Sequence, residues 1–141
     1  MAAHTKTTPR RGVLIYPGHA FDPAEWMNFV EARGFSDDWD DLRLTDDDLF
    51  AAQVAIQANP TGPPVVKGTG GLRKMRFSVP KKGGKQKWIR ICYVYFPSAC
   101  VVFLVIAYAK NERDDLTQAD KKAIKAFIKR ERAILSKHAI K

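Results

Sequence analysis

The sequence predicts an α+β domain in which a small twisted antiparallel sheet carries N-terminal helices packed on it and a C-terminal helix. Three observations lead there: helix-like segments before residue 60, strand-like segments between residues 72 and 109, and an amphipathic segment at the end. The chain has 141 residues, which suits one domain with a real core. The order of segments therefore favours one α+β unit over separate domains.

The N-terminal third predicts helices behind an extension. Residues 1–20 are expected to form that extension, partly mobile, in which Val13–Tyr16 could add a strand, and residues 21–141 the domain itself. Asp22-Pro23-Ala24-Glu25 is typical of a helix start, with Trp26, Phe29 and Val30 on one face and a stop at Arg33-Gly34. Thr45 and the three aspartates after it predict a second helix to about Ala58.

Three strands and a helix are expected in the second half of the chain. The strand segments are Leu72–Val79, Trp88–Phe96 and Cys100–Ala109. The uncharged run 91–109 is just long enough for a membrane span, but Pro97-Ser98-Ala99 interrupts it, so it predicts two strands and a tight turn. A capping pattern from Thr117 to Asp120 starts the last helix, whose apolar residues keep helical spacing.

The two cysteines and the N-terminus indicate an intracellular protein. Cys92 and Cys100 lie in apolar sequence and are expected to be a free, buried pair, with a hairpin disulfide as the alternative. The first eleven residues are polar and do not resemble a secretory signal, so the expected location is the cytoplasm, without a membrane partner. Neither the cysteines nor the three histidines form a metal-ligand pattern.

Charge is distributed unevenly along the chain. There are 24 Lys and Arg against 15 Asp and Glu, a net charge of +9. Residues 1–60 hold 5 basic and 10 acidic residues, and residues 61–141 hold 19 basic and 5 acidic. Nine of the cations lie between Thr61 and Arg90, where no acid occurs. Such a cationic half indicates a polyanionic partner, nucleic acid before an anionic membrane, with a merely solubilising surface as the alternative.

The cations of the expected strands could converge on one end of one sheet face. The segment Gly68–Arg76 is a glycine-rich turn followed by a strand, and it lacks the Gly-Lys-Ser/Thr and the helix of a phosphate loop. Arg90 lies on the next strand and Lys110 ends the third. Tyr93 and Tyr95 would lie nearby, where a tyrosine can stack on a base or contact a phosphate.

These segments resemble a family of bacterial toxins. The stretches GTGGLRKMR (68–76), WIRICY (88–93) and YAKNERDDL (108–116), with the helix after them, are similar to the RelE/ParE superfamily, closest to its HigB-like branch. The resemblance covers residues 60–132. It implies a RelE-like microbial ribonuclease-type fold and a toxin of a type II toxin–antitoxin module that cleaves messenger RNA on the ribosome. Bulky Trp88 departs from the family pattern, in which this position is often small or polar.

Carried over residue by residue, the resemblance implies the roles of the site. The expected catalytic residues are Arg90, Arg73, Lys85, Lys87 and Tyr93. The expected RNA- and phosphate-binding residues are Lys74, Arg76, Lys81, Lys82, Tyr95 and Lys110. Arg90 would contact the scissile phosphate, and Lys85 or Lys87 would be the base that takes the proton of the ribose 2′-hydroxyl. No metal and no organic cofactor is implied.

The partners that the resemblance implies are an antitoxin, often of helix-turn-helix type, the 70S ribosome and messenger RNA. Two other readings stay open. The first is a binder without catalysis, either a gyrase poison of the ParE type or a decayed homologue that binds RNA or a protein partner. The second is a small structural nucleic-acid-binding protein.

Overall fold

The computed structural model describes residues 3–6, 26–110 and 116–138. The expected strand Val13–Tyr16 and the expected helix start at Asp22 lie outside these residues. The described elements, in chain order, are β1 (Ala3–Lys6), β2 (Asn28–Ala32), α1 (Arg33–Asp41), α2 (Asp46–Ala58), β3 (Arg73–Pro80), β4 (Gln86–Phe96), β5 (Val101–Ala109) and α3 (Gln118–His138). Short 3-10 turns follow β3 (Lys82–Gly84) and β4 (Pro97–Ala99).

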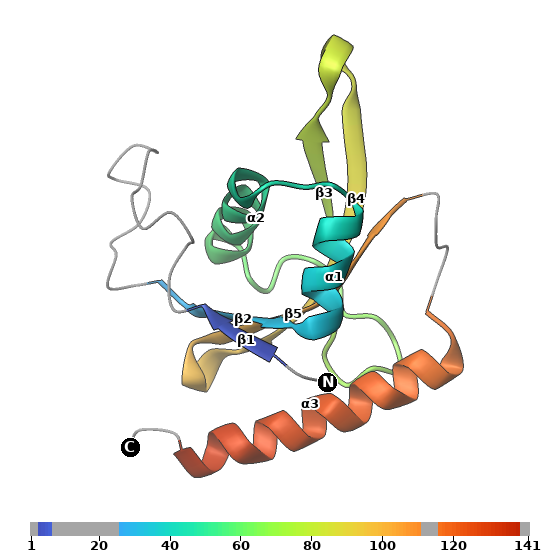
Figure 1. The fold of residues 1–141 in the computed structure, drawn as a ribbon. Coiled ribbons are helices and arrows are strands. Elements are labelled where there is room, and N and C mark those ends of the chain that lie inside the picture. The colour runs from blue at the N-terminus through green and yellow to red at the C-terminus, as the bar shows by residue number, and fades with distance from the viewer. Residues whose placement is uncertain (1–2, 7–25, 111–115, 139–141) are drawn as a thin grey trace.

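The elements form an α+β fold with a C-terminal helix, as the sequence predicts. Helices lie on both faces of the single sheet (Figure 1). The strand order is β1-β2-β5-β4-β3. Three of the strand pairs are antiparallel, and β2 pairs with β5 in parallel. The sheet is therefore mixed rather than wholly antiparallel, because the chain crosses from β2 to its neighbour through α1, α2 and the β3–β4 hairpin.

The prediction of a helix through Phe29 and Val30 is wrong. Residues 28–32 form β2, which lies between β1 and β5 and is buried from Phe29 to Ala32. Phe29 packs in the core beneath α1 and α2, whereas Val30 packs in the core beneath α3. In a strand that is buried on both faces, the apolar residues do not alternate with polar ones. Over a short segment, such a pattern cannot be distinguished from that of a buried helix. Ala3–Lys6, expected in a tail, pairs with β2 as β1.

The second predicted helix is confirmed as α2, and its cap explains its start. The Thr45 hydroxyl accepts from the Asp48 N–H at 3.1 Å, and an Asp48 carboxylate oxygen accepts from the Thr45 N–H at 2.9 Å. This capping box satisfies two backbone donors, and three aspartates in the first turn suit the positive helix end. Thr117 and Asp120 make the same reciprocal pair ahead of α3.

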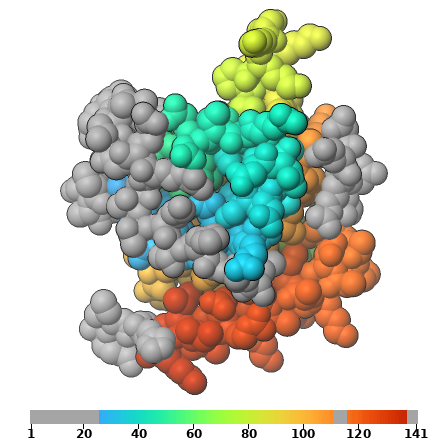
Figure 2. All heavy atoms as spheres, in the orientation of Figure 1, coloured from blue at the N-terminus to red at the C-terminus, as the bar shows by residue number. Residues whose placement is uncertain are grey.

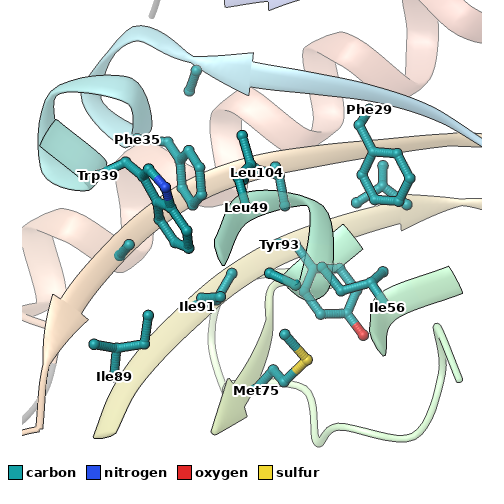
Figure 3. Packing of buried hydrophobic residues seen from close by; sticks show 14 of the residues in the cluster. Phe29, Phe35, Trp39, Leu49, Ile56, Met75, Ile89, Ile91, Tyr93 and Leu104 are labelled. Atoms are coloured by element: carbon teal, nitrogen blue, oxygen red, sulfur yellow. The ribbon is translucent and has the colours of Figure 1, made fainter. Parts of the chain in front are cut away.

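The sheet separates two apolar clusters. On one face, α1 and α2 cover a cluster that includes Phe35, Trp39, Leu49, Ile91 and Tyr93 (Figure 3). On the other face, α3 covers a second cluster. That second cluster contains Leu72, Cys92, Val94, Phe96, Phe103, Ile124, Phe127 and Ile128. Alternate residues of each central strand thus supply opposite cores, which fixes the face to which every β3 and β4 side chain belongs.

The β3–β4 hairpin extends beyond the two layers of helices. Its tip stands clear of the body of the molecule in Figures 1 and 2. The Lys81 N–H donates to the Lys85 carbonyl at 2.8 Å, and Gly83 and Gly84 take positive φ angles of 83° and 78° in the tip between them. Residues 81–86 are all exposed. The hairpin therefore presents its lysines to solvent rather than to the core.

Neither Cys92 nor Cys100 forms a disulfide, and only Cys92 is buried. Cys100 is exposed at the turn between β4 and β5, where it adopts a left-handed φ of 54°. The expectation of a buried pair is therefore wrong for Cys100, because the tight turn that joins these strands lies at the surface.

Candidate functional site

The register of β3 and β4 divides the predicted site between the two faces of the sheet. Arg76 lies opposite Arg90, and Arg73 lies opposite Tyr93. Tyr93 belongs to the cluster beneath α1 and α2, so Arg73 and Lys87 share that face. Arg76 and Arg90 alternate with these residues and lie on the face that carries α3. The expected convergence of all the cations on one face is therefore wrong.

Three cations remain together in a hollow, which we call the Arg90 pocket. It has a volume of about 660 Å³. Its lining consists of Lys74, Arg76 and Arg90 with Ala55, Asn59, Pro63, Pro64 and Met75. The pocket thus runs from the end of α2 and the segment 63–64 to the cations of β3 and β4.

Arg90 is the most distinctive residue of this pocket. Its Nη1 nitrogen is buried and has no hydrogen-bond partner among the described residues. Arg76 lies directly across the strand pair, and like charges placed opposite each other are destabilising. A buried donor without a partner costs further free energy. A bound anion would relieve both costs, so the electrostatics of the pocket fit a phosphate.

Arg73 holds the segment before β3 in place. Its Nη1 donates to the carbonyls of Thr61 at 2.9 Å and Pro63 at 2.7 Å. The Lys74 N–H also donates to the Pro64 carbonyl at 3.0 Å, next to these contacts. The side chain of Arg73 is therefore engaged with the backbone that forms one wall of the Arg90 pocket, outside the pocket lining itself.

Tyr93 is a core residue rather than a surface aromatic. It is fully buried, and its hydroxyl donates to the Pro60 carbonyl at 2.8 Å (Figure 3 shows the ring within the cluster). Burial raises the pKa of Tyr93 to about 12, an effect that the nearby Arg73 partly opposes. Its ring cannot stack on a base without opening the core. Tyr95 is half-buried against the same cluster.

Neither lysine expected to act as the base lies in the Arg90 pocket. The Lys87 Nζ donates to the Leu42 carbonyl at 2.7 Å, at the end of α1. Lys85 is exposed in the hairpin tip. It precedes Arg90 by five residues, which corresponds to about 17 Å along an extended strand. Lys74, which sequence reasoning assigned to binding alone, is the lysine that lines the pocket.

A second hollow lies at the start of β4 and the end of β5, and we call it the Trp88 pocket. It has a volume of about 540 Å³. Its lining consists of Lys81, Gln86, Lys87, Trp88, Ala109 and Lys110. The Lys110 N–H donates to the Trp88 carbonyl at 3.3 Å, which brings this predicted phosphate-binding residue beside the indole. Lys82 lies outside both pockets, exposed in the hairpin tip.

The glycine-rich turn before β3 has a structural explanation. The Thr69 hydroxyl donates to the Val66 carbonyl at 2.7 Å and accepts from the Leu72 N–H at 3.0 Å. Gly70 takes a positive φ of 78°, and a Cβ there would meet the Lys125 side chain of α3 at 3.4 Å. The turn therefore sets β3 against α3, and the sequence motif marks the start of the cationic strand rather than a cradle for phosphate.

No protein-family model matches the chain. Among the residues that the structure describes, no helix has the length and apolar character that crossing a membrane requires. Within the same residues, no group of three or more His, Cys, Asp or Glu side chains is arranged to hold a metal ion.

Proposed function

We propose that the protein is the toxin of a type II toxin–antitoxin module and that it cleaves messenger RNA on the ribosome. The observation that carries the proposal is the buried Arg90 Nη1 nitrogen, which has no hydrogen-bond partner among the described residues and lies in a hollow that Lys74 and Arg76 also line. A cationic pocket on a protein whose basic residues gather in residues 61–141 fits a polyanion, and the resemblance of residues 60–132 supports RNA.

The proposed reaction is the attack of a ribose 2′-hydroxyl on the adjacent phosphate. The O2′–P bond forms and the P–O5′ bond breaks, which leaves a cyclic phosphate and a free 5′-hydroxyl. Arg90 and Arg76 neutralise the negative charge that grows on the phosphate oxygens. Lys74, which lines the same hollow, is the residue placed to take up the 2′-hydroxyl proton as an amine and to return a proton to the leaving O5′ as the P–O5′ bond breaks.

A second candidate is a binding protein without catalysis, such as a decayed homologue that binds RNA or a protein partner. It is favoured by one specific observation: three of the five expected catalytic residues, Arg73, Lys87 and Tyr93, donate to backbone carbonyls. Side chains held in this way stabilise the fold and are not available to a substrate. A gyrase poison is a further form of this candidate. The next experiment separates the messenger-cleaving toxin, the gyrase poison and the inert binder.

The test is induction of the protein in bacterial cells with mapping of messenger 5′ ends. The wild type should arrest growth and cut messages inside translated reading frames. Arg90→Ala should lose both effects, whereas Arg33→Ala, the same change at an exposed arginine of α1, should keep them. Circular dichroism confirms that the variants fold. Induced DNA breaks would support the gyrase poison instead, and intact messages and DNA would support the inert binder.

A further inference from the structure

The least expected surface residue of the sheet is Trp88. Its side chain is 45% exposed, although its neighbour Ile89 is fully buried. It lies on a central strand, on the face that carries α3, but α3 packs on Cys92 and the residues after it. A large aromatic ring on a central strand normally contributes to a core. Here the uncovered end of the sheet leaves the indole accessible.

Cations surround this indole on two sides. The Arg76 guanidinium carbon lies 5.8 Å from the ring centroid, within the range of a cation–π contact. On the neighbouring strand, the Lys110 backbone is hydrogen-bonded to Trp88, and Lys110 and Lys81 line the Trp88 pocket with the indole. Arg76 also lines the Arg90 pocket, so this one residue adjoins both the indole and the proposed phosphate site.

The spacing along β4 connects the two pockets. Trp88 and Arg90 are two residues apart and point to the same face, which corresponds to about 7 Å. A phosphate at Arg90 and a base at Trp88 can therefore belong to the same or adjacent nucleotides. Proteins that bind single strands combine a cationic groove with exposed aromatic rings, because every base offers a π-face.

We propose that Trp88 is a stacking platform for an unpaired nucleobase next to the phosphate that Arg90 holds. This inference rests on the proposed RNA-binding function and names the state of the substrate: a single-stranded segment whose base lies flat on the indole. The hollow beside the ring accommodates the base, and Lys81 and Lys110 neutralise the flanking phosphates. Arg76, on the neighbouring strand β3, holds the indole in place through its cation–π contact.

The experiment compares two probes of equal length and charge: a single-stranded RNA hexamer and the same ribose–phosphate hexamer without bases. Trp88→Ala should weaken binding of the RNA by roughly 5- to 100-fold, the range of one stacked base. Binding of the abasic probe should stay within about twofold. Trp88→Phe should keep most of the RNA affinity, because a smaller ring still stacks.

Two results would overturn the stacking platform. One is unchanged RNA binding by Trp88→Ala, which would leave the exposed indole to another kind of contact, such as a protein partner. The other is an equal loss for both probes, which would mean that the ring only holds Arg76. Indole fluorescence gives a second readout, because quenching by RNA should vanish in Trp88→Phe while buried Trp39 remains as the reference.

Arg90→Ala separates this inference from the proposed function. If RNA is held as proposed, Arg90→Ala should weaken both probes, since it removes a phosphate contact that needs no base. If Arg90→Ala has no effect while Trp88→Ala acts on RNA alone, the phosphate site fails and the stacking platform stands. If Arg90→Ala weakens binding of both probes and Trp88→Ala weakens binding of neither, the phosphate site stands and the stacking platform fails.

Discussion

At the scale of single residues, hydrogen bonds to backbone carbonyls distinguish side chains that build the fold from those that remain available. Arg73, Lys87 and Tyr93 donate to such carbonyls, whereas Arg90 has a buried donor without a partner among the described residues. The cost of leaving that donor unsatisfied is of the size of a hydrogen bond. Arg90 is therefore the residue that the proposed function assigns to the phosphate.

The buried hydroxyl of Tyr93 predicts a specific loss of stability in alkali. The pKa is raised from 10.0 to about 12 in the folded chain, mainly by burial. The unfolded chain therefore releases this proton first. The contribution to stability is intact below pH 10.0 and is lost as the pH rises toward about 12. Tyr93→Phe lacks a group that ionises and should not show this loss.

The measurement is the urea midpoint as a function of pH for the wild type and Tyr93→Phe. Between pH 10.0 and about 12 the wild type should lose about 2 kcal/mol more than the variant. Difference absorbance of tyrosinate should show the corresponding late titration in the wild type only. Parallel stability curves for the two proteins would contradict the buried, neutral tyrosine.

At the scale of elements, Lys87 connects β4 to the end of α1. Its ammonium group donates to the Leu42 carbonyl, which lies where the last carbonyls of the helix lack partners within the helix. Lys87→Met keeps the aliphatic stem and removes this bond, so it should lower the free energy of unfolding by about 1–2 kcal/mol.

Lys85→Met is the matched control, since Lys85 is exposed in the hairpin tip and its side chain makes no hydrogen bond to the described residues. Its unfolding free energy should stay within about 0.5 kcal/mol of the wild type. Urea denaturation of both variants provides the comparison. Equal stabilities for Lys87→Met and Lys85→Met would show that the contact with α1 contributes nothing.

Elements with local signals were predictable from the sequence, and those that depend on distant partners were not. The capping residues of α2 and α3 act within one turn, and the β4–β5 hairpin consists of two apolar runs joined by a turn. In contrast, β2 is a strand because β1 and β5 flank it, and Ala3–Lys6 is a strand because β2 pairs with it. Such non-local pairing overrides local propensity.

The division of the site was partly readable in advance. Because side chains alternate along a strand, Arg73 and Arg76 must face opposite sides, as must Lys87 and Arg90. This alternation alone places these cations on opposite faces of the sheet. The expectation that all of them share one face did not take it into account. The carbonyls that engage Arg73 and Lys87 come from segments far away in sequence, so these contacts required the fold.

At the scale of the whole molecule, helices cover both faces of the sheet but leave one end of the α3 face open. That end carries Arg76, Trp88 and Arg90. The tip of the β3–β4 hairpin projects from the body of the molecule (Figure 2). The cations of the Arg90 pocket and the Trp88 pocket all belong to residues 61–141, the strongly basic part of the chain. This positive charge would attract a polyanion before any specific contact forms. Under the proposed function, this charge attracts RNA at long range and the Arg90 pocket holds one phosphate.

Single-turnover cleavage on isolated 70S ribosomes, programmed with a defined message, tests the central role of Arg90 most directly. Arg90→Ala should cut the message about 100- to 1,000-fold more slowly than the wild type, the usual effect of removing a group that stabilises transition-state charge. Arg33→Ala should match the wild type. Cleavage by folded Arg90→Ala at the wild-type rate would contradict the assignment of this pocket to the reacting phosphate.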